Sequence, residues 1–150
     1  MPIKLSSPAF SNGDPIPEQY GYTRQNINPP LVIDGVPETA RSLVLIMDDP
    51  DAREPAGKIW DHWLIWNIEP ATGKIPEDWD GDGATEGNND YGESGYGGPN
   101  PPDGKHTYYF KLYALDTELD LSTGASKDQL AAAMDGHILE QAELTGTFAP

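Results

Sequence analysis

The chain has 150 residues and a mass of 16.3 kDa, which fits a single domain over residues 1–150 with one sizeable core. It carries 25 acidic residues against 9 lysines and arginines, and the net charge of −16 argues against nucleic acid as a partner recognised through bulk charge. It has no cysteine, which excludes disulfides, thiolate zinc sites and cysteine nucleophiles.

The N-terminal segment lacks the pattern of a signal peptide, and no apolar run is long enough to span a membrane. We therefore expect a cytoplasmic protein without integral membrane contact. The excess of acidic residues is also typical of proteins that stay soluble in concentrated salt, so the composition suits a halophile.

Short runs separated by glycine and proline predict strands and turns rather than long helices. The clearest strands are Ser42–Asp48, His62–Ile68 and His106–Leu115. The first is apolar, as in a strand buried on both faces, and the other two are rich in aromatic and β-branched residues. Leu31–Gly35 and Ile138–Phe148 are weaker candidates for strands.

One helix is predicted over Lys127–Asp135. Ser126 and Gln129 have the spacing of a capping box, and Gly136 fits the left-handed position that ends a helix. Together the elements predict a mainly β, mostly antiparallel domain with one or two short helices.

Two carboxylates, Asp49 and Asp51, directly follow the first strand. A residue before proline is held in extended geometry, and extended residues two apart point the same way when no turn intervenes. The pair is therefore a candidate for one wall of a site. A turn capped by aspartates is the alternative interpretation of Asp-Pro-Asp.

Two histidines open the other strong strands. Period two places His62 on one face with Leu64 and Trp66, and it places His106 with Tyr108 on an apolar face. A buried imidazole and a buried phenol both need polar partners, which makes this combination a candidate site. Each histidine taken alone fits a structural role equally well.

Residues 92–104 form the least ordinary segment, because glycines and prolines crowd together there. Glycine lets the backbone approach a ligand closely, whereas proline offers no amide donor, so this is not a phosphate-binding loop of the Gly-rich type. An ordinary turn-rich loop is the alternative. Asp80-Gly-Asp82 lacks the later glutamate of a calcium loop and indicates a solvated turn.

The two aspartates and two histidines named above include the residue types of a zinc or iron site. Their spacing matches no metal motif, and no nucleotide or cofactor motif occurs. We therefore expect neither a metal nor a cofactor.

In their order along the chain, these segments resemble the phosphatidylethanolamine-binding protein family, and in particular its short bacterial and archaeal, Raf-kinase-inhibitor-like branch. The resemblance runs nearly end to end. It rests on Phe10–Gly13 (FSNG), Asn28–Leu31 (NPPL), Ser42–Asp51 (SLVLIMDDPD), His62–Trp63, Gly95–Pro102 (GYGGPNPP), Tyr108–Asp116 (YYFKLYALD) and Glu143–Thr147.

The resemblance implies a Greek-key sandwich of two antiparallel sheets with peripheral helices, and a small surface pocket for phosphate-like or carboxylate-like anions such as a phospholipid head group. Carried over by motif, the ligand-binding residues are Asp49, Asp51, His62, Gly98, Pro99, His106 and Tyr108. Thr107 stands where the family usually has arginine, and Arg53-Glu54 stands where Ala-Pro is common, so the rim of the pocket differs from the family pattern.

Bare carboxylates repel an anion, so we expect Asp49 and Asp51 to hydrogen-bond the two imidazoles instead. This contact favours the protonated forms, in which His62 and His106 face the ligand as donors, and Tyr108 adds a neutral donor. Anion binding is then expected to tighten at mildly acidic pH.

The leading functional hypothesis is a non-enzymatic protein that binds a small anionic ligand or phosphoryl group. One alternative is a hydrolase that uses an Asp/His pair on a small ester, with Ser94 as the available nucleophile. Another is an interaction module that inhibits a kinase or a protease, as the family label suggests. Edge strands of such a sandwich are also able to pair into a homodimer.

Overall fold

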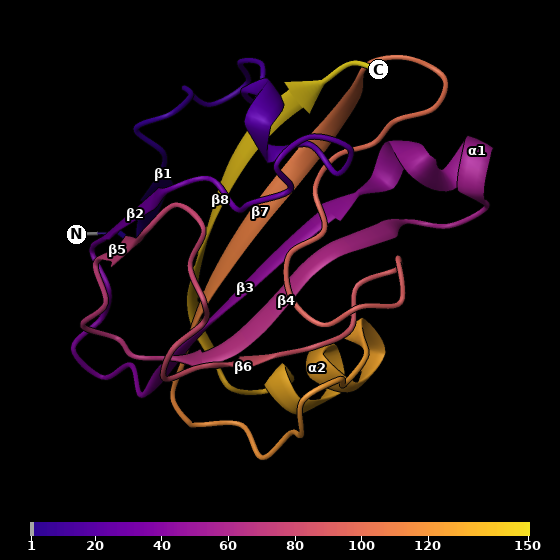
Figure 1. Ribbon diagram of the computed structural model, residues 1–150. Coiled ribbons are helices and arrows are strands. Elements are labelled where there is room, and N and C mark those ends of the chain that lie inside the picture. Colours follow the sequence, from indigo (N-terminus) through magenta and orange to yellow (C-terminus); the bar gives the residue numbers. More distant parts are fainter. Residues whose placement is uncertain (1) are drawn as a thin grey trace.

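The computed structural model describes residues 2–150, apart from the side chains of Glu54 and Pro55. The chain forms two antiparallel sheets (Figure 1). The larger sheet has the order β6-β4-β3-β7-β8, with β3 at Ser42–Asp49, β4 at Trp60–Ile68, β6 at Thr85–Glu86, β7 at His106–Leu115 and β8 at Ile138–Phe148. The smaller has the order β1-β2-β5, with β1 at Lys4–Ser6, β2 at Leu31–Asp34 and β5 at Lys74–Ile75. The prediction of a mainly β, two-sheet fold is confirmed.

The predicted helix is present as α2, Lys127–Met134. Ser126 and Gln129 make both hydrogen bonds of a capping box, and Gly136 has a φ of 81° just beyond the helix. The remaining helices are short: α1 at Arg53–Ala56 and two 3-10 turns, η1 at Glu18–Tyr20 and η2 at Pro50–Ala52. No described helix has both the length and the apolar character needed to cross a bilayer.

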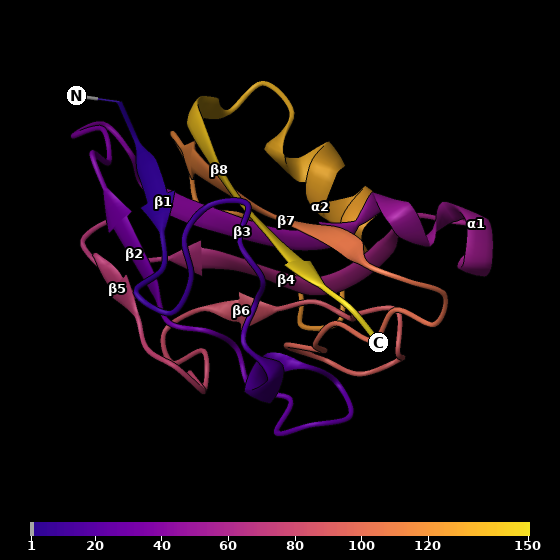
Figure 2. The ribbon, with the colours of Figure 1, turned by 90° about the horizontal axis from the view of Figure 1, so that it is seen from above.

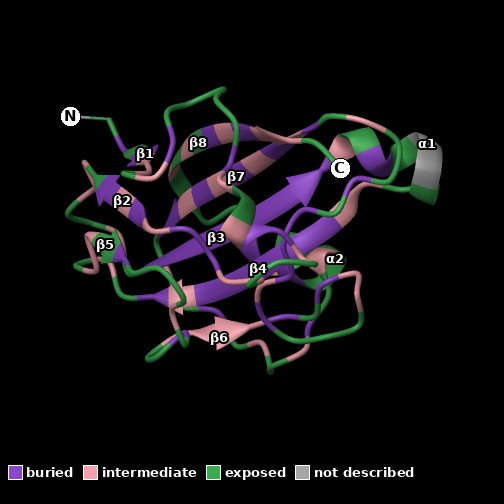
Figure 3. Ribbon diagram, turned by 45° about the horizontal axis from the view of Figure 1, so that its top comes forward, coloured by how far each residue is buried: buried purple, intermediate pink, exposed green. Residues whose placement is uncertain are grey.

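Both faces of the five-stranded sheet are covered, which explains the apolar sequence of β3, whose eight residues are all buried (Figure 3). One face packs against the smaller sheet and the N-terminal segment through residues such as Leu5, Leu45 and Phe110. The other face packs against α2, where Leu130 lies with Trp66. Figure 2 shows the smaller sheet and α2 separated by the strands of the larger sheet.

A β-bulge interrupts β4 near its start and decides where His62 lies. Met47 pairs with Trp63, but the next residue of β3, Asp48, pairs with Asp61, so one residue of β4 is left without an opposite partner. That residue is His62, and its ring lies 5.2 Å from the ring of Tyr108. Period two had placed His62 on the face of Leu64 and Trp66. That prediction was wrong, because a bulge inserts one residue into the alternation.

Candidate functional site

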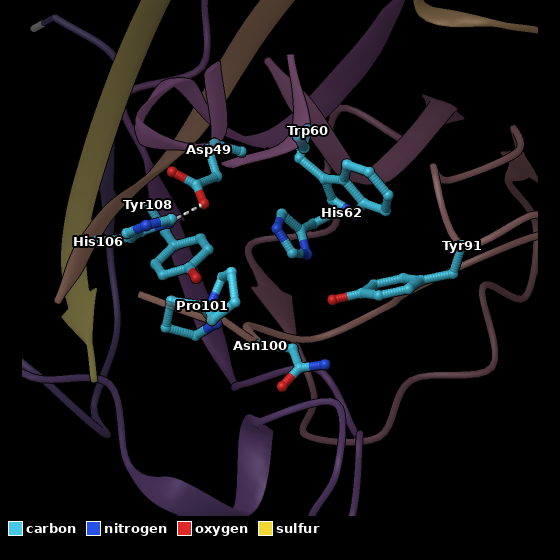
Figure 4. Close-up of a pocket in the computed structure, with 11 residues that line it drawn as sticks. Asp49, Trp60, His62, Tyr91, Asn100, Pro101, His106 and Tyr108 are labelled. Atoms are coloured by element: carbon cyan, nitrogen blue, oxygen red, sulfur yellow. Dashed lines mark hydrogen bonds and ion pairs between the residues drawn. The ribbon is translucent and has the colours of Figure 1, made fainter. Parts of the chain in front are cut away.

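A cavity of about 300 Å³ lies where β3 ends and where β4 and β7 begin (Figure 4). Residues from the loop that precedes β7 close its remaining side. The lining residues are Asp49, Ala52, Ala56, Trp60, His62, Tyr91, Asn100, Pro101, Pro102, His106 and Tyr108. The wall is mostly aromatic and aliphatic with a few convergent polar groups, which is the usual character of a small-ligand site.

Asp49 and His106 form a buried pair in this cavity, with 2.6 Å between Asp49 Oδ2 and His106 Nδ1, and it is an ion pair when the ring is protonated. The other ring nitrogen of His106 lies 2.7 Å from Asp103 Oδ1. Burial lowers the pKa of His106, but the two carboxylates outweigh burial, and the net effect is a raised pKa. Burial also raises the pKa of Asp49, which the hydrogen bond from His106 partly offsets. The predicted contact between an aspartate and this imidazole is therefore present.

His62 has a different environment. Its Nδ1 lies 2.7 Å from the carbonyl oxygen of Gly97, so the ring donates to the backbone and contacts no carboxylate. Burial lowers the pKa of His62 to about 4. The sequence predicts an aspartate that keeps His62 protonated, but no described carboxylate contacts the ring in the structure. Burial favours the neutral ring instead, with Nε2 as the nitrogen left for a ligand.

Two donors in the cavity wall have no hydrogen-bond partner among the described residues. The Tyr108 hydroxyl is fully buried without a well-formed hydrogen bond, although the backbone amide of Asn100 is near enough to lower its pKa. The indole Nε1 of Trp60 is also buried and unpaired. Burial raises the pKa of Tyr108, so its hydroxyl keeps its proton. Because buried polar groups in native proteins nearly always find a partner, these two donors are the candidate contacts for a ligand with acceptor atoms.

Asp51 does not line the cavity, because the η2 turn follows Asp49 directly and breaks the extended geometry. The Asp49 carboxylate caps this turn by accepting from the Asp51 amide at 2.9 Å. The exposed Asp51 side chain accepts from the Thr107 amide at 2.8 Å. The alternative of an aspartate-capped turn is thus what the structure shows, and Asp51 connects η2 to β7.

Gly98 and Pro99 also lie outside the cavity lining, and both shape the loop behind it. The Gly98 amide donates to Asn26 Oδ1, and the Pro99 carbonyl accepts from the Tyr22 amide. Gly98 has to be glycine here, because a Cβ atom would lie 2.0 Å from the Tyr20 carbonyl oxygen. The close approach is therefore between two backbone segments.

Sequence reasoning missed the aromatic and proline walls of the cavity. Trp60 and Tyr91 face each other edge to face with ring centroids 5.5 Å apart, and Tyr91 stacks on Tyr22. Pro101 and Pro102 come from the loop that the sequence had singled out, but nothing in their spacing showed which residues of that loop face inward. For Trp60, its position two residues before His62 was the available signal.

Other sequence candidates lie apart from this cavity or form no site. The Ser94 hydroxyl donates to Asn88 Oδ1 and does not line the cavity. Asp80 and Asp82 form an exposed turn closed by the Asp82 amide. The described histidines and acidic residues do not group into a set of three or more able to hold a metal ion.

Comparison with known proteins identifies the family. A family model described as phosphatidylethanolamine-binding protein matches residues 6–149. The chain belongs to this family. A UPF0098 protein of Methanothermobacter thermautotrophicus is 47% identical over 97% of this chain and 98% of its own length. A UPF0098 protein of Chlamydia trachomatis is 45% identical with the same coverage. These relatives confirm the bacterial and archaeal branch that the motifs predicted.

Solved structures agree with this assignment. A phosphatidylethanolamine-binding protein homologue from Chlamydia trachomatis has a TM-score of 0.93 and 45% identity, covering 97% of this chain and 96% of that one. YbcL from E. coli, described as a member of the mammalian PEBP family, has a TM-score of 0.90 and 29% identity, with coverage of 99% and 98%. A phosphatidylethanolamine-binding protein from Plasmodium vivax, with 15% identity and a TM-score of 0.60, shares the fold alone.

Proposed function

We propose that the cavity binds one phosphate-type or carboxylate-type group, such as the anionic part of a phospholipid head group, and that the protein acts by binding rather than by catalysis. The observation that carries this proposal is the fully buried Tyr108 hydroxyl, which faces the cavity without a partner among the described residues. The Trp60 indole adds a second unpaired donor. Two neutral donors in one cavity suit an acceptor group with several oxygens.

The electrostatics of the wall are compatible with an anion although Asp49 belongs to it. Both Asp49 oxygens accept hydrogen bonds, one from His106 and one from the Asp51 amide. The Asp49 charge is paired with His106 and buried, so it does not meet an incoming anion as an isolated charge. An anion next to His62 Nε2 favours the protonated ring, which raises the pKa of His62 above its free value of about 4. Affinity therefore rises as the pH falls.

The geometry favours binding over the hydrolase alternative. A general base needs a ring nitrogen free to accept a proton from a nucleophile or a water molecule. Both nitrogens of His106 contact carboxylates, and Ser94 does not line the cavity. His62 keeps Nε2 free, but its other nitrogen pairs with the Gly97 carbonyl and not with a carboxylate, so neither histidine forms the Asp/His general-base pair of the hydrolase alternative. The Asp49–His106 pair is therefore arranged to hold structure around the ligand.

Calorimetric titration with glycerophosphoethanolamine tests the proposal, because this soluble phosphodiester keeps a single negative phosphate charge across the range tested. We expect saturable binding that is tighter near pH 5.5 than near pH 7.5. Tyr108→Phe removes one hydrogen bond to a charged group and is expected to weaken binding about 10- to 100-fold. Tyr109→Phe is the matched control, since Tyr109 is the next residue of β7 and lies on the opposite face of the sheet.

Equal affinity of wild type and Tyr108→Phe would contradict the assignment of this cavity as the site. Flat or inverted pH dependence would contradict the role given to His62. Turnover of a phosphate or carboxylate ester that is lost in both His62→Ala and His106→Ala would favour the enzyme instead.

A further inference from the structure

Both ring nitrogens of His106 contact carboxylates, and neither is free to face the cavity. Nδ1 lies 2.6 Å from Asp49 Oδ2, and Nε2 lies 2.7 Å from Asp103 Oδ1. A neutral imidazole carries one N–H, so only the protonated ring is able to donate to both carboxylates at once. The bridge from Asp49 through His106 to Asp103 therefore depends on a single proton.

The two carboxylates differ in what happens when that proton leaves. The Asp49 side chain is 4% exposed and would stay buried and unpaired, whereas the Asp103 side chain is 53% exposed and water is able to solvate it. Leaving a buried charge without a partner costs far more than exposing a surface one. The remaining proton therefore stays on Nδ1, facing Asp49. The Nε2 lone pair then faces the Asp103 carboxylate, and this contact breaks.

The Asp103 contact holds one wall of the cavity. Asp103 directly follows Asn100, Pro101 and Pro102, which line that wall, and the two prolines have no amide hydrogen to fix them. Within the described part of the chain, the bond to His106 is the only side-chain hydrogen bond found for residues 100–105, and the Asn100 backbone amide acts on the Tyr108 hydroxyl. Breaking the bond to His106 frees the segment between Pro99 and the start of β7.

We propose that the Asp49–His106–Asp103 bridge is a proton-controlled strap: it holds the wall segment 100–103 against the cavity when His106 is protonated and releases that segment when His106 is neutral. In this role His106 is a positioning residue rather than a ligand donor. The effect on ligand affinity rests on the function proposed above, whereas the movement of the wall does not.

The surroundings of His106 fix the direction of the switch. Asp49 approaches from β3 and Asp103 from the preceding loop, and both raise the pKa of His106 against the opposing effect of burial. The exposed Asp51 of η2 is engaged with the neighbouring Thr107 amide. On the remaining sides, the exposed Lys105 precedes the ring in sequence, Tyr108 lies 6.3 Å away on the same strand, and β8 offers Phe148, which does not titrate. The strap is therefore closed at low pH and opens as the pH rises through the pKa of His106.

NMR of the ligand-free chain tests the strap without any ligand. We expect the backbone amides of Asp103 and Gly104 to titrate with the same midpoint as the His106 ring. Asp103→Asn removes the charge, and its amide is able to pair with either form of the ring. In this variant the His106 midpoint should fall by about one pH unit, and the Gly104 signal should stop following it. Asp116→Asn is the matched control, because Asp116 pairs with His137 at the surface over 2.8 Å, and it should change neither His106 nor Gly104.

Loop signals that ignore the His106 midpoint in the wild type would overturn the strap, as would an unchanged midpoint in Asp103→Asn. Titration with glycerophosphoethanolamine separates the two proposals. If the loop titrates but the ligand does not bind, the strap stands and the proposed function fails. If the ligand binds while the loop stays indifferent to His106, the function stands and the strap fails.

Discussion

The neutral, buried His62 makes a prediction about the pH dependence of stability. The pKa of His62 is about 4 in the folded chain, because burial opposes the charged form, against 6.5 for an ordinary histidine. A lowered pKa means that the unfolded state binds the proton more readily. His62 therefore contributes full stability above pH 6.5, and that contribution is lost as the pH falls towards 4. The loss from this one group is about 2 kcal/mol at pH 5 and about 3 kcal/mol at pH 4.

His62→Asn isolates this effect. The Asn side-chain NH₂ is able to replace the Nδ1–H that donates to the Gly97 carbonyl, but it does not titrate. The variant is expected to be less stable than the wild type near pH 7.5, because it leaves space where the imidazole was. As the pH falls to 5, the difference in free energy of unfolding between the two proteins should shrink by about 2 kcal/mol.

Urea denaturation of both proteins at several pH values measures this difference, and taking the difference cancels the titration of the other acidic groups and of His106. Phosphate and carboxylates have to be kept out of the buffers, since a bound anion would itself raise the pKa of His62. A difference that stays constant from pH 7.5 to 5 would refute the claim that His62 is held neutral by burial.

Two further substitutions test how the site is supported. Gly98→Ala places a Cβ atom 2.0 Å from the Tyr20 carbonyl oxygen and should lower the free energy of unfolding by about 3 kcal/mol or more. Gly104→Ala, with open space around it, should change the free energy of unfolding little. Equal effects of the two substitutions in thermal or urea unfolding would contradict the close approach. Ser126→Ala removes the cap of α2 and should cost about 1 kcal/mol, against almost nothing for the exposed Ser122→Ala; a cost below a few tenths of a kcal/mol would show that packing of Leu130 alone holds the helix.

The long strands were predictable from the sequence because their patterns run over seven or more residues. β7 and β8 have the predicted bounds, and β3 and β4 differ from prediction by one or two residues. β5 and β6 have two residues each and β1 has three, which is too short for any periodicity to appear. Their positions follow from tertiary pairing alone.

The candidate site was predictable in part, and the misses have local causes. His106 and Tyr108 share one face of their strand, as period two predicts, and both line the cavity. Asp49 lines it from the end of β3, directly after the predicted strand. His62 does not follow the alternation of its strand, because a bulge is a property of two paired strands that one strand's sequence does not carry. Asp51 does not line the cavity because the proline before it begins a 3-10 turn rather than continuing the strand, which is the turn that the sequence left open as an alternative.

The net charge of −16 is compatible with an anion site, because the site relies on neutral donors and the nearby lysines pair with aspartates elsewhere. Lys58, Lys111 and Lys127 pair with Asp90, Asp48 and Asp61, and no lysine or arginine is among the described residues that line the cavity.

The unpaired donors of the cavity are the neutral Tyr108 hydroxyl and Trp60 indole, which stabilise an anion by hydrogen bonds without cancelling its charge. Near pH 7.5, where burial keeps His62 neutral, a second negative charge would be buried without a counter-charge and next to Asp49, at a high cost in desolvation. The cavity should therefore prefer a singly charged phosphodiester to a doubly charged phosphomonoester. Near pH 7.5 we expect glycerophosphoethanolamine to bind more tightly than phosphoethanolamine, and the reverse order would show that a cation, such as His62 protonated by the bound anion, contributes to the site.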